Sequence, residues 1–264
     1  MGLPESLAET QIERDGIIRA AKERQKCGSC RKSPAEAVNC ARTDAWIDAD
    51  GECRITCQPC PKGQAYLRQK RIDRLTSASG MGSRFQERRF DTFQPTMGTE
   101  LAYRVCRGFC EDYTPHAKGI RLIGPYGCGK THLAAAVLNA MIGRGIPGMF
   151  VVVPDLLRQI RIGFDDREMA KRANEIVDTA KSAPLLVLDD LGAEKPSDWV
   201  REYLFILLNT RYEKELPTIV TTNCTTAELI AKLQQRIVSR LVEMTTSVVM
   251  TAPDFRLAKA QGIA

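Results

Sequence analysis

From about residue 84 onward, short apolar runs alternate along the chain with longer segments of mixed polarity. The apolar runs predict strands over residues 120–123, 149–153, 185–189, 218–222 and 247–251. Apolar residues recur at helical spacing in the segments between them, which predicts helices over residues 130–142, 154–162, 167–181, 198–216 and 227–242. Strands that alternate with helices favour an α/β fold, with a five-stranded parallel sheet covered on both faces.

The first 65 residues follow a different pattern, with frequent turn residues and little apolar sequence. Six of the ten cysteines lie between Cys27 and Cys60. We therefore predict a cysteine-rich N-terminal module over residues 1–65 and a basic, flexible linker over residues 66–83. The α/β domain is expected over residues 84–264.

A glycine-rich motif joins the first predicted strand of this domain to its first predicted helix. It consists of Gly124, Pro125, Tyr126, Gly127, Cys128, Gly129, Lys130 and Thr131, and it matches the Walker A pattern. Glycines let backbone N–H groups approach phosphate oxygens, and the start of a helix favours negative charge. We expect Lys130 to reach the β- and γ-phosphates of ATP and Thr131 to bind Mg²⁺.

Acidic and amide side chains follow two further strands of the predicted sheet. Asp189 and Asp190 end the strand over residues 185–189, and Asn223 follows the strand over residues 218–222. The carboxyl ends of parallel strands meet at one edge, beside the Walker A motif. We predict that Asp189 holds Mg²⁺, that Asp190 polarises the attacking water and that Asn223 positions this water. A glutamate at this position would reach one methylene farther toward the attacking water. The shorter Asp190 leaves a gap there, which favours slow hydrolysis.

Arg236 and Arg240 lie four residues apart and therefore share one face of a predicted helix. An arginine in such a position can act on the γ-phosphate bound by a neighbouring subunit. A surface ion pair with Glu243 is the alternative interpretation.

The N-terminal cysteines have the spacing of a zinc site. Cys27, Cys30, Cys57 and Cys60 form two C-x-x-C pairs, which can place four thiolates around Zn²⁺. Zinc would also supply folding free energy to a module with little core. Cys40 and Cys53 lie between the pairs, and either could replace one of the four ligands.

Basic residues are concentrated between residues 61 and 89, where eight lysines and arginines face two acidic residues. Such a stretch suits a polyanion such as nucleic acid, although a solvated linker helix explains it equally well. No apolar run approaches the ~20 residues that span a bilayer. The N-terminus lacks the pattern of a secretory signal, and the cysteines fit a reducing compartment, so we expect a cytoplasmic protein.

Taken together, these motifs resemble the AAA+ ATPases of the DnaC/DnaI/IstB group. The resemblance covers about residues 84–264 and includes the Leu-Asp-Asp-Leu-Gly-Ala-Glu run over residues 188–194 and the Thr-Thr-Asn run over residues 221–223. It implies an AAA+ domain without a helical lid, preceded by the zinc module, and it favours Arg240 as the arginine that acts between subunits. In many AAA+ proteins this lid carries an arginine that acts at the ATP site, and the resemblance suggests Arg256 as its replacement.

The resemblance also implies a function. It suggests an ATPase that loads a replicative DnaB-type helicase, binds it through the zinc module, assembles with itself through the ATP site and binds single-stranded DNA. The segment over residues 155–181 resembles the DNA-binding insert of such ATPases and contains basic residues on either side of Phe164. An IstB-like transposition helper and an ATP-gated adaptor with little hydrolysis are the alternatives.

Overall fold

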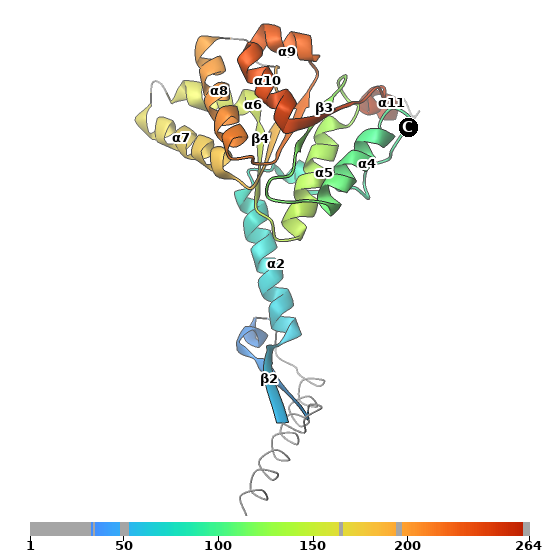
Figure 1. Cartoon of the computed structure of the whole chain (residues 1–264), viewed down its shortest axis with the longest axis vertical. Coiled ribbons are helices and arrows are strands. Elements are labelled where there is room, and N and C mark those ends of the chain that lie inside the picture. The colour runs from blue at the N-terminus through green and yellow to red at the C-terminus, as the bar shows by residue number, and fades with distance from the viewer. Residues whose placement is uncertain (1–32, 34, 48–52, 164–165, 194–196, 261–264) are drawn as a thin grey trace, which may run out of the picture. The chain divides into compact units, whose positions relative to one another are not determined.

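The computed structural model describes residues 33, 35–47, 53–163, 166–193 and 197–260. The chain divides into two compact units, Met1–Arg71 and Ile72–Ala264 (Figure 1).

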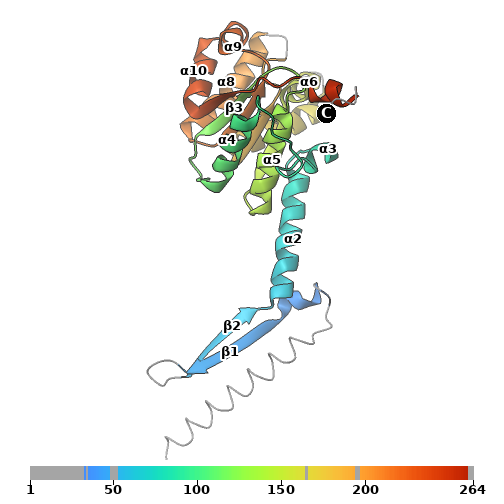
Figure 2. The same ribbon diagram turned by 90° about the vertical axis from the view of Figure 1, so that its right-hand side faces the viewer.

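The first unit contains an antiparallel hairpin, which is followed directly by a helix (Figure 2). Its elements are η1 (Glu36–Asn39), β1 (Ala41–Ile47), β2 (Cys53–Pro59) and the start of α2 (Pro61–Ala78). At the base of the hairpin, the N–H of Cys60 donates to the carbonyl of Cys40 at 2.9 Å. Gly63 has no side chain, which lets α2 approach the carbonyl of Ala37. Helix α2 runs through much of the segment, residues 66–83, for which the sequence predicted a flexible linker.

The second unit is built on a parallel sheet with the strand order β4-β5-β6-β3-β7. The strands are β3 (Gly119–Ile123), β4 (Gly148–Val152), β5 (Leu185–Asp189), β6 (Thr218–Thr222) and β7 (Thr245–Val249). The helices are α3 (Ser83–Gln86), α4 (Glu100–Glu111), α5 (Lys130–Gly143), α6 (Val153–Ile162), α7 (Arg167–Ser182), α8 (Asp198–Glu213), α9 (Thr226–Leu233), α10 (Gln235–Met244) and α11 (Phe255–Ala260). The predicted α/β fold with a five-stranded parallel sheet is confirmed.

The sheet separates two hydrophobic cores. Side chains of alternate strand residues point to opposite faces, so Leu186 and Leu188 of β5 join one core while Leu185 and Val187 join the other. Helices α6 to α10 cover the first face, and α4 and α5 cover the second. Because both faces are covered, only the ends of the strands remain for a binding site.

Two predicted elements near the C-terminus were wrong in detail. The single helix over residues 227–242 is two helices, because Gln234 between α9 and α10 has a left-handed φ of 74° that interrupts the helix. The last strand begins two residues earlier than predicted, since β7 follows α10 with no loop between them. No helix among the described residues is both long and apolar enough to cross a membrane.

Candidate ATP site

The glycine-rich motif forms the turn between β3 and α5, as the sequence predicted. Gly127 and Gly129 have φ angles of 73° and 99°, which residues with a side chain rarely adopt. Lys130 and Thr131 begin α5, and this places the positive end of the helix dipole at the loop. The backbone therefore has the form that a phosphate-binding loop requires.

Lys130 is folded back onto the loop that precedes it. Its ammonium donates to the carbonyl oxygens of Gly124 at 2.9 Å and Pro125 at 2.7 Å, and to Oδ1 of Asn223 at 2.5 Å. Burial lowers the pKa of Lys130. The structure thus brings together the end of β6 and the start of α5, and with them two of the predicted site residues.

Asp189 is buried at the end of β5. The hydroxyl of Thr221 donates to its Oδ1 at 2.6 Å. Burial raises the pKa of Asp189 to about 6 and Asp190 adds to this shift, whereas hydrogen bonds from Thr221 and Thr131 act against it. A threonine hydroxyl beside a carboxylate supplies the oxygen ligands that Mg²⁺ prefers, so Thr131 and Asp189 fit the predicted magnesium site.

Asp190 follows Asp189 in an unusual conformation, with a φ of 59°. Its N–H donates to the hydroxyl of Thr221 at 2.9 Å. The carboxylate of Asp190 is close enough to influence the pKa of both Lys130 and Asp189. The sequence placed Thr221 in the Thr-Thr-Asn run of the family resemblance but indicated no role for its hydroxyl, because a threonine in a strand is ordinary.

Arg240 makes its contacts with α8. Its guanidinium lies 5.1 Å from the ring centre of Phe205 and 5.8 Å from that of Tyr212, and it donates to the carbonyl of Arg236 at 2.9 Å. Arg236 stacks on Phe205 as well, at 4.5 Å. The two arginines thus share one helix face, as predicted. Both contact Phe205 of α8, whereas Lys130 and Asn223 of the candidate ATP site contact each other.

A segment near the C-terminus packs against the phosphate-binding loop. The N–H of Phe255 donates to the carbonyl of Gly127 at 3.2 Å, and the carboxylate of Asp254 lies where a side chain on Gly127 would point. Arg256 is close enough to lower the pKa of Lys130. Sequence reasoning found Arg256 but missed Asp254, whose one signal is its position at the start of a short helix.

Aromatic residues that precede β3 in the chain complete the surroundings of the loop. The ring of Phe93 stacks on Tyr103 at 5.9 Å and meets the edge of His132 at 5.1 Å. Phe93 also occupies the space that a side chain on Gly129 would need. His132 bonds in turn with the hydroxyl of Thr92 at 3.2 Å. These contacts fasten residues 90–93 to the start of α5.

The predicted zinc ligands lie mostly outside the described residues. Cys27 and Cys30 are not described, and for Cys57 only the backbone is. Among the residues that the structure describes, no three histidine, cysteine or acidic side chains gather as a metal site would require. The zinc site therefore stays a prediction.

The segment expected to bind DNA forms α6 and α7. Five of its six basic residues are exposed, whereas Lys181 in the last turn of α7 is half-buried: the exposed ones are Arg158, Arg161, Arg167, Lys171 and Arg172. Phe164 lies outside the described residues, and exposed acidic residues such as Asp155 and Glu168 are interspersed. The surface charge is therefore mixed, as the sequence indicated.

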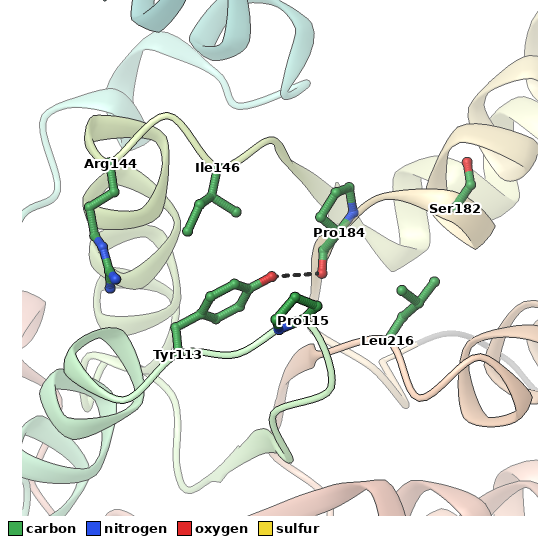
Figure 3. Close-up of a pocket in the computed structure, with 7 residues that line it drawn as sticks. All are labelled: Tyr113, Pro115, Arg144, Ile146, Ser182, Pro184 and Leu216. Carbon is green, nitrogen blue, oxygen red and sulfur yellow. Dashed lines mark hydrogen bonds between the residues drawn. The ribbon is translucent and has the colours of Figure 1, made fainter.

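A pocket of about 490 Å³ lies at the opposite end of the strands (Figure 3). Its lining residues all precede a strand of the sheet: Tyr113, Pro115, Arg144, Ile146, Ser182, Pro184 and Leu216. The hydroxyl of Tyr113 donates to the carbonyl of Pro184 at 3.3 Å across it. Because the candidate ATP site is built from residues that follow strands, this pocket is separate from that site.

A phosphate-binding loop between β3 and α5, acidic residues at the end of β5 and an amide after β6 define a nucleotide-binding fold of the P-loop AAA+ class. The family model described as "IstB-like ATP binding protein" matches residues 65–261, and the chain belongs to this family. The resemblance to the DnaC/DnaI/IstB group that the sequence suggested is thereby confirmed.

Individual relatives include two helicase loaders. Replicative helicase loader DnaI of Bacillus subtilis (strain 168) is 34% identical over 117 residues, which are 44% of this chain and 36% of DnaI. Replicative helicase loader DnaC of Escherichia coli (strain K12) is 23% identical over 175 residues, which are 66% of this chain and 71% of DnaC. A crystal structure of the DnaC helicase loader has a TM-score of 0.58 at 32% identity and covers 64% of this chain and 99% of that chain. The chain thus spans little more than a third of DnaI's length.

Proposed function

We propose that this protein is an ATP-dependent loader of a replicative DnaB-type helicase. The observation that carries the proposal is the similarity of 64% of this chain to a solved structure of the DnaC helicase loader, at 32% identity. In this proposal the N-terminal module binds the helicase, and the AAA+ domain binds ATP and single-stranded DNA.

Each residue of the ATP site has a defined role in the proposal. Residues 124–131 enclose the phosphates, and Lys130 leaves Asn223 to neutralise the β- and γ-phosphate oxygens. Thr131 and Asp189 would hold Mg²⁺, which neutralises phosphate charge when bound. Asp190 polarises the attacking water, and the freed amide of Asn223 orients it.

Assembly of several subunits would complete the site. Arg240 leaves Phe205 and Tyr212 and reaches the γ-phosphate held by a neighbouring subunit. Arg240 is half-buried, and a cation–π contact is worth about 0.5–2 kcal/mol, a cost that the new contact with the γ-phosphate can offset. ATP would therefore favour the assembled state, and hydrolysis would release the loader.

DNA and helicase would bind at different parts of the chain. The exposed arginines and lysines of α6 and α7 can follow the phosphates of a single strand. Cys27, Cys30, Cys57 and Cys60 would bind Zn²⁺, and the hydrogen bond between Cys60 and Cys40 keeps the backbone of the second cysteine pair at the base of the hairpin. Either Cys40 or Cys53 could take the place of one ligand.

Helicase capture tests the proposal directly. The full chain should retain the host replicative helicase in a pull-down with ATP, and zinc chelation or Cys27→Ser should abolish retention. Arg240→Ala, which leaves the zinc module unchanged, should still bind the helicase but fail to load it onto single-stranded DNA covered with binding protein. A chain that contains zinc but does not bind the helicase would contradict the loader assignment.

The description of the matching family favours a second candidate, an IstB-like transposition helper. Such a protein would bind duplex DNA and a transposase. ATP-dependent retention on a long duplex, with no preference for single strands, would favour this function over helicase loading. An ATP-gated adaptor would instead bind ATP with little multiple-turnover hydrolysis, even when single-stranded DNA is present.

A further inference from the structure

Asp190 has a backbone conformation that nothing in its local sequence demands. Among the described residues, only Asp190, Glu215 and Gln234 have a left-handed φ without being glycine. Glu215 follows the end of α8, where left-handed residues are common, and Gln234, with a ψ of 152°, forms the break between α9 and α10. Asp190 instead follows a strand, so contacts from elsewhere in the fold must hold it in this conformation.

Those contacts come from two adjacent threonines of β6. The hydroxyl of Thr221 donates to Oδ1 of Asp189 at 2.6 Å and accepts the N–H of Asp190 at 2.9 Å. The N–H of Leu191 donates to the carbonyl of Thr221 at 2.9 Å, and the hydroxyl of Thr222 donates to the carbonyl of Leu191 at 2.6 Å. Four hydrogen bonds therefore fix the three residues centred on Asp190.

The hydroxyl groups are the informative part of these side chains. Thr221 and Thr222 are completely buried, and the two preceding buried residues of β6, Ile219 and Val220, are apolar. A strand prefers β-branched residues, but valine would satisfy that preference without a buried hydroxyl. The hydroxyls of Thr221 and Thr222 lie where β6 passes the turn after β5, and both form hydrogen bonds with residues of that turn or of the end of β5.

We propose that Thr221 is a positioning residue of the ATP site, which orients Asp189 and, together with Thr222, holds Asp190 in the left-handed conformation that directs its carboxylate to the site. This inference rests on the proposed ATPase function. Thr221 touches neither substrate nor reacting atoms and acts through the two aspartates. Asn223, the residue proposed to orient the water, follows directly after Thr222 at the end of β6. The end of β6 therefore both positions the two aspartates and carries this amide.

Removal of the Thr221 hydroxyl tests the proposal. Thr221→Val should lower kcat about 10- to 100-fold, as expected when the hydrogen-bond partner of a metal-binding carboxylate is lost. Thr221→Ser keeps the hydroxyl, so its kcat should stay within about threefold of the wild-type value. ATP affinity in EDTA should be unchanged in both variants, whereas the gain in affinity on adding Mg²⁺ should fall in Thr221→Val only.

Thr218→Val is a matched control for general loss of stability. Thr218 is equally buried in the same strand, and its hydroxyl bonds with Arg211 at 2.9 Å rather than with the site. This variant should lower the melting temperature but leave kcat and the Mg²⁺ effect unchanged. If the loss of kcat in Thr218→Val and Thr221→Val is proportional to the decrease in their melting temperatures, Thr221 has a structural role only.

A double variant shows whether Thr221 acts through the aspartates. In an Asp190→Asn background, Thr221→Val should cost much less in kcat than in the wild type, because the carboxylate it positions is already absent. If Thr221→Val lowers kcat by the same factor in both backgrounds, Thr221 does not act through Asp190, and this part of the proposal is wrong. If the wild type has no turnover, the ATPase function fails, and the Mg²⁺ dependence of ATP affinity alone decides the role of Thr221: an equal dependence in wild type and Thr221→Val overturns it.

Discussion

The ammonium of Lys130 donates to Oδ1 of Asn223 at 2.5 Å, which joins the phosphate-binding loop to the end of β6. In the proposed function both side chains take other partners once ATP is bound, because Lys130 faces the phosphates and Asn223 faces the attacking water. The buried ammonium of Lys130 would then be held in the free protein by the amide that later orients the water. This one hydrogen bond would couple ATP binding to the preparation for hydrolysis.

Asn223→Ala separates the two roles. We expect ATP affinity to rise about threefold, because Lys130 no longer gives up a charge-assisted hydrogen bond when ATP binds. Hydrolysis should fall about 100-fold, because an oriented polar group is lost from the site. Titration with a fluorescent ATP analogue and single-turnover kinetics measure the two effects.

Asn209→Ala is a suitable control for Asn223→Ala. Asn209 is a surface amide on α8 that bonds with Glu213 at 2.8 Å, so its loss should change neither affinity nor rate. Weaker ATP binding in Asn223→Ala would show that the contact with Lys130 prepares the loop rather than restrains it.

Asp254→Asn should increase ATP affinity. The Asp254 carboxylate lies against Gly127, beside the position where the phosphates are expected, and like charges repel by roughly 1 kcal/mol at close range in water. We expect about fivefold tighter binding at low salt, with a smaller gain at high salt because the repulsion is screened. Asparagine caps helices as well as aspartate does, so α11 should be preserved. Equal affinities at every salt concentration would contradict this prediction.

Arg211→Leu should destabilise the AAA+ domain severely. The guanidinium of Arg211 is completely buried and donates to the carbonyls of Ala180, Ala183 and Pro217, all at 2.7–2.8 Å. Leucine leaves these carbonyls without their donor, which should cost about 3 kcal/mol or more of unfolding free energy. Urea denaturation measures the change.

Arg107→Leu provides the comparison for Arg211→Leu. Arg107 is exposed and pairs with Glu111 at 3.3 Å, an ion pair of the kind worth less than about 1 kcal/mol. Similar losses in the two variants would mean that the buried hydrogen bonds of Arg211 contribute little.

The sequence was sufficient to predict the five strands of the parallel sheet, the helices that join them apart from the break at Gln234, and the site residues that follow the strands, but not α4 or the β1–β2 hairpin. Apolar runs predicted β5 and β6, and parallel pairing then required Asp189 and Asn223 to share an edge. These predictions succeeded because they depend on local patterns and on one general property of parallel sheets. The identity of the family followed from motifs of the same kind.

Contacts between distant parts of the chain could not be predicted in this way. Asp254 meets Gly127 more than a hundred residues away, and no periodicity records that contact. The hydrogen bond from the N–H of Asp190 to the hydroxyl of Thr221 is a contact of the same kind, since a threonine in a strand is ordinary. The break at Gln234 was missed for a related reason, since neither glycine nor proline marks it.

The pH dependence of stability should reveal the buried carboxyl of Asp189. Its pKa of about 6 lies above the ordinary value of 3.8, because burial disfavours the charged form. The folded protein therefore binds more protons than the unfolded chain between about pH 4 and pH 6, and its unfolding free energy should fall as the pH rises through this range. At neutral pH, the ionised carboxylate destabilises the protein by at most about 3 kcal/mol.

Asp189→Asn should remove this effect. In EDTA at pH 7.5 the variant should be more stable than the wild type by about 1–3 kcal/mol, and the difference should shrink toward zero near pH 4, where Asp189 is protonated. Chemical denaturation over this pH range measures the difference. Asp198→Asn changes an exposed carboxylate of α8 and should leave the pH profile as it is in the wild type. A stability difference between Asp189→Asn and the wild type that stays constant with pH would show that the carboxyl does not titrate in this range.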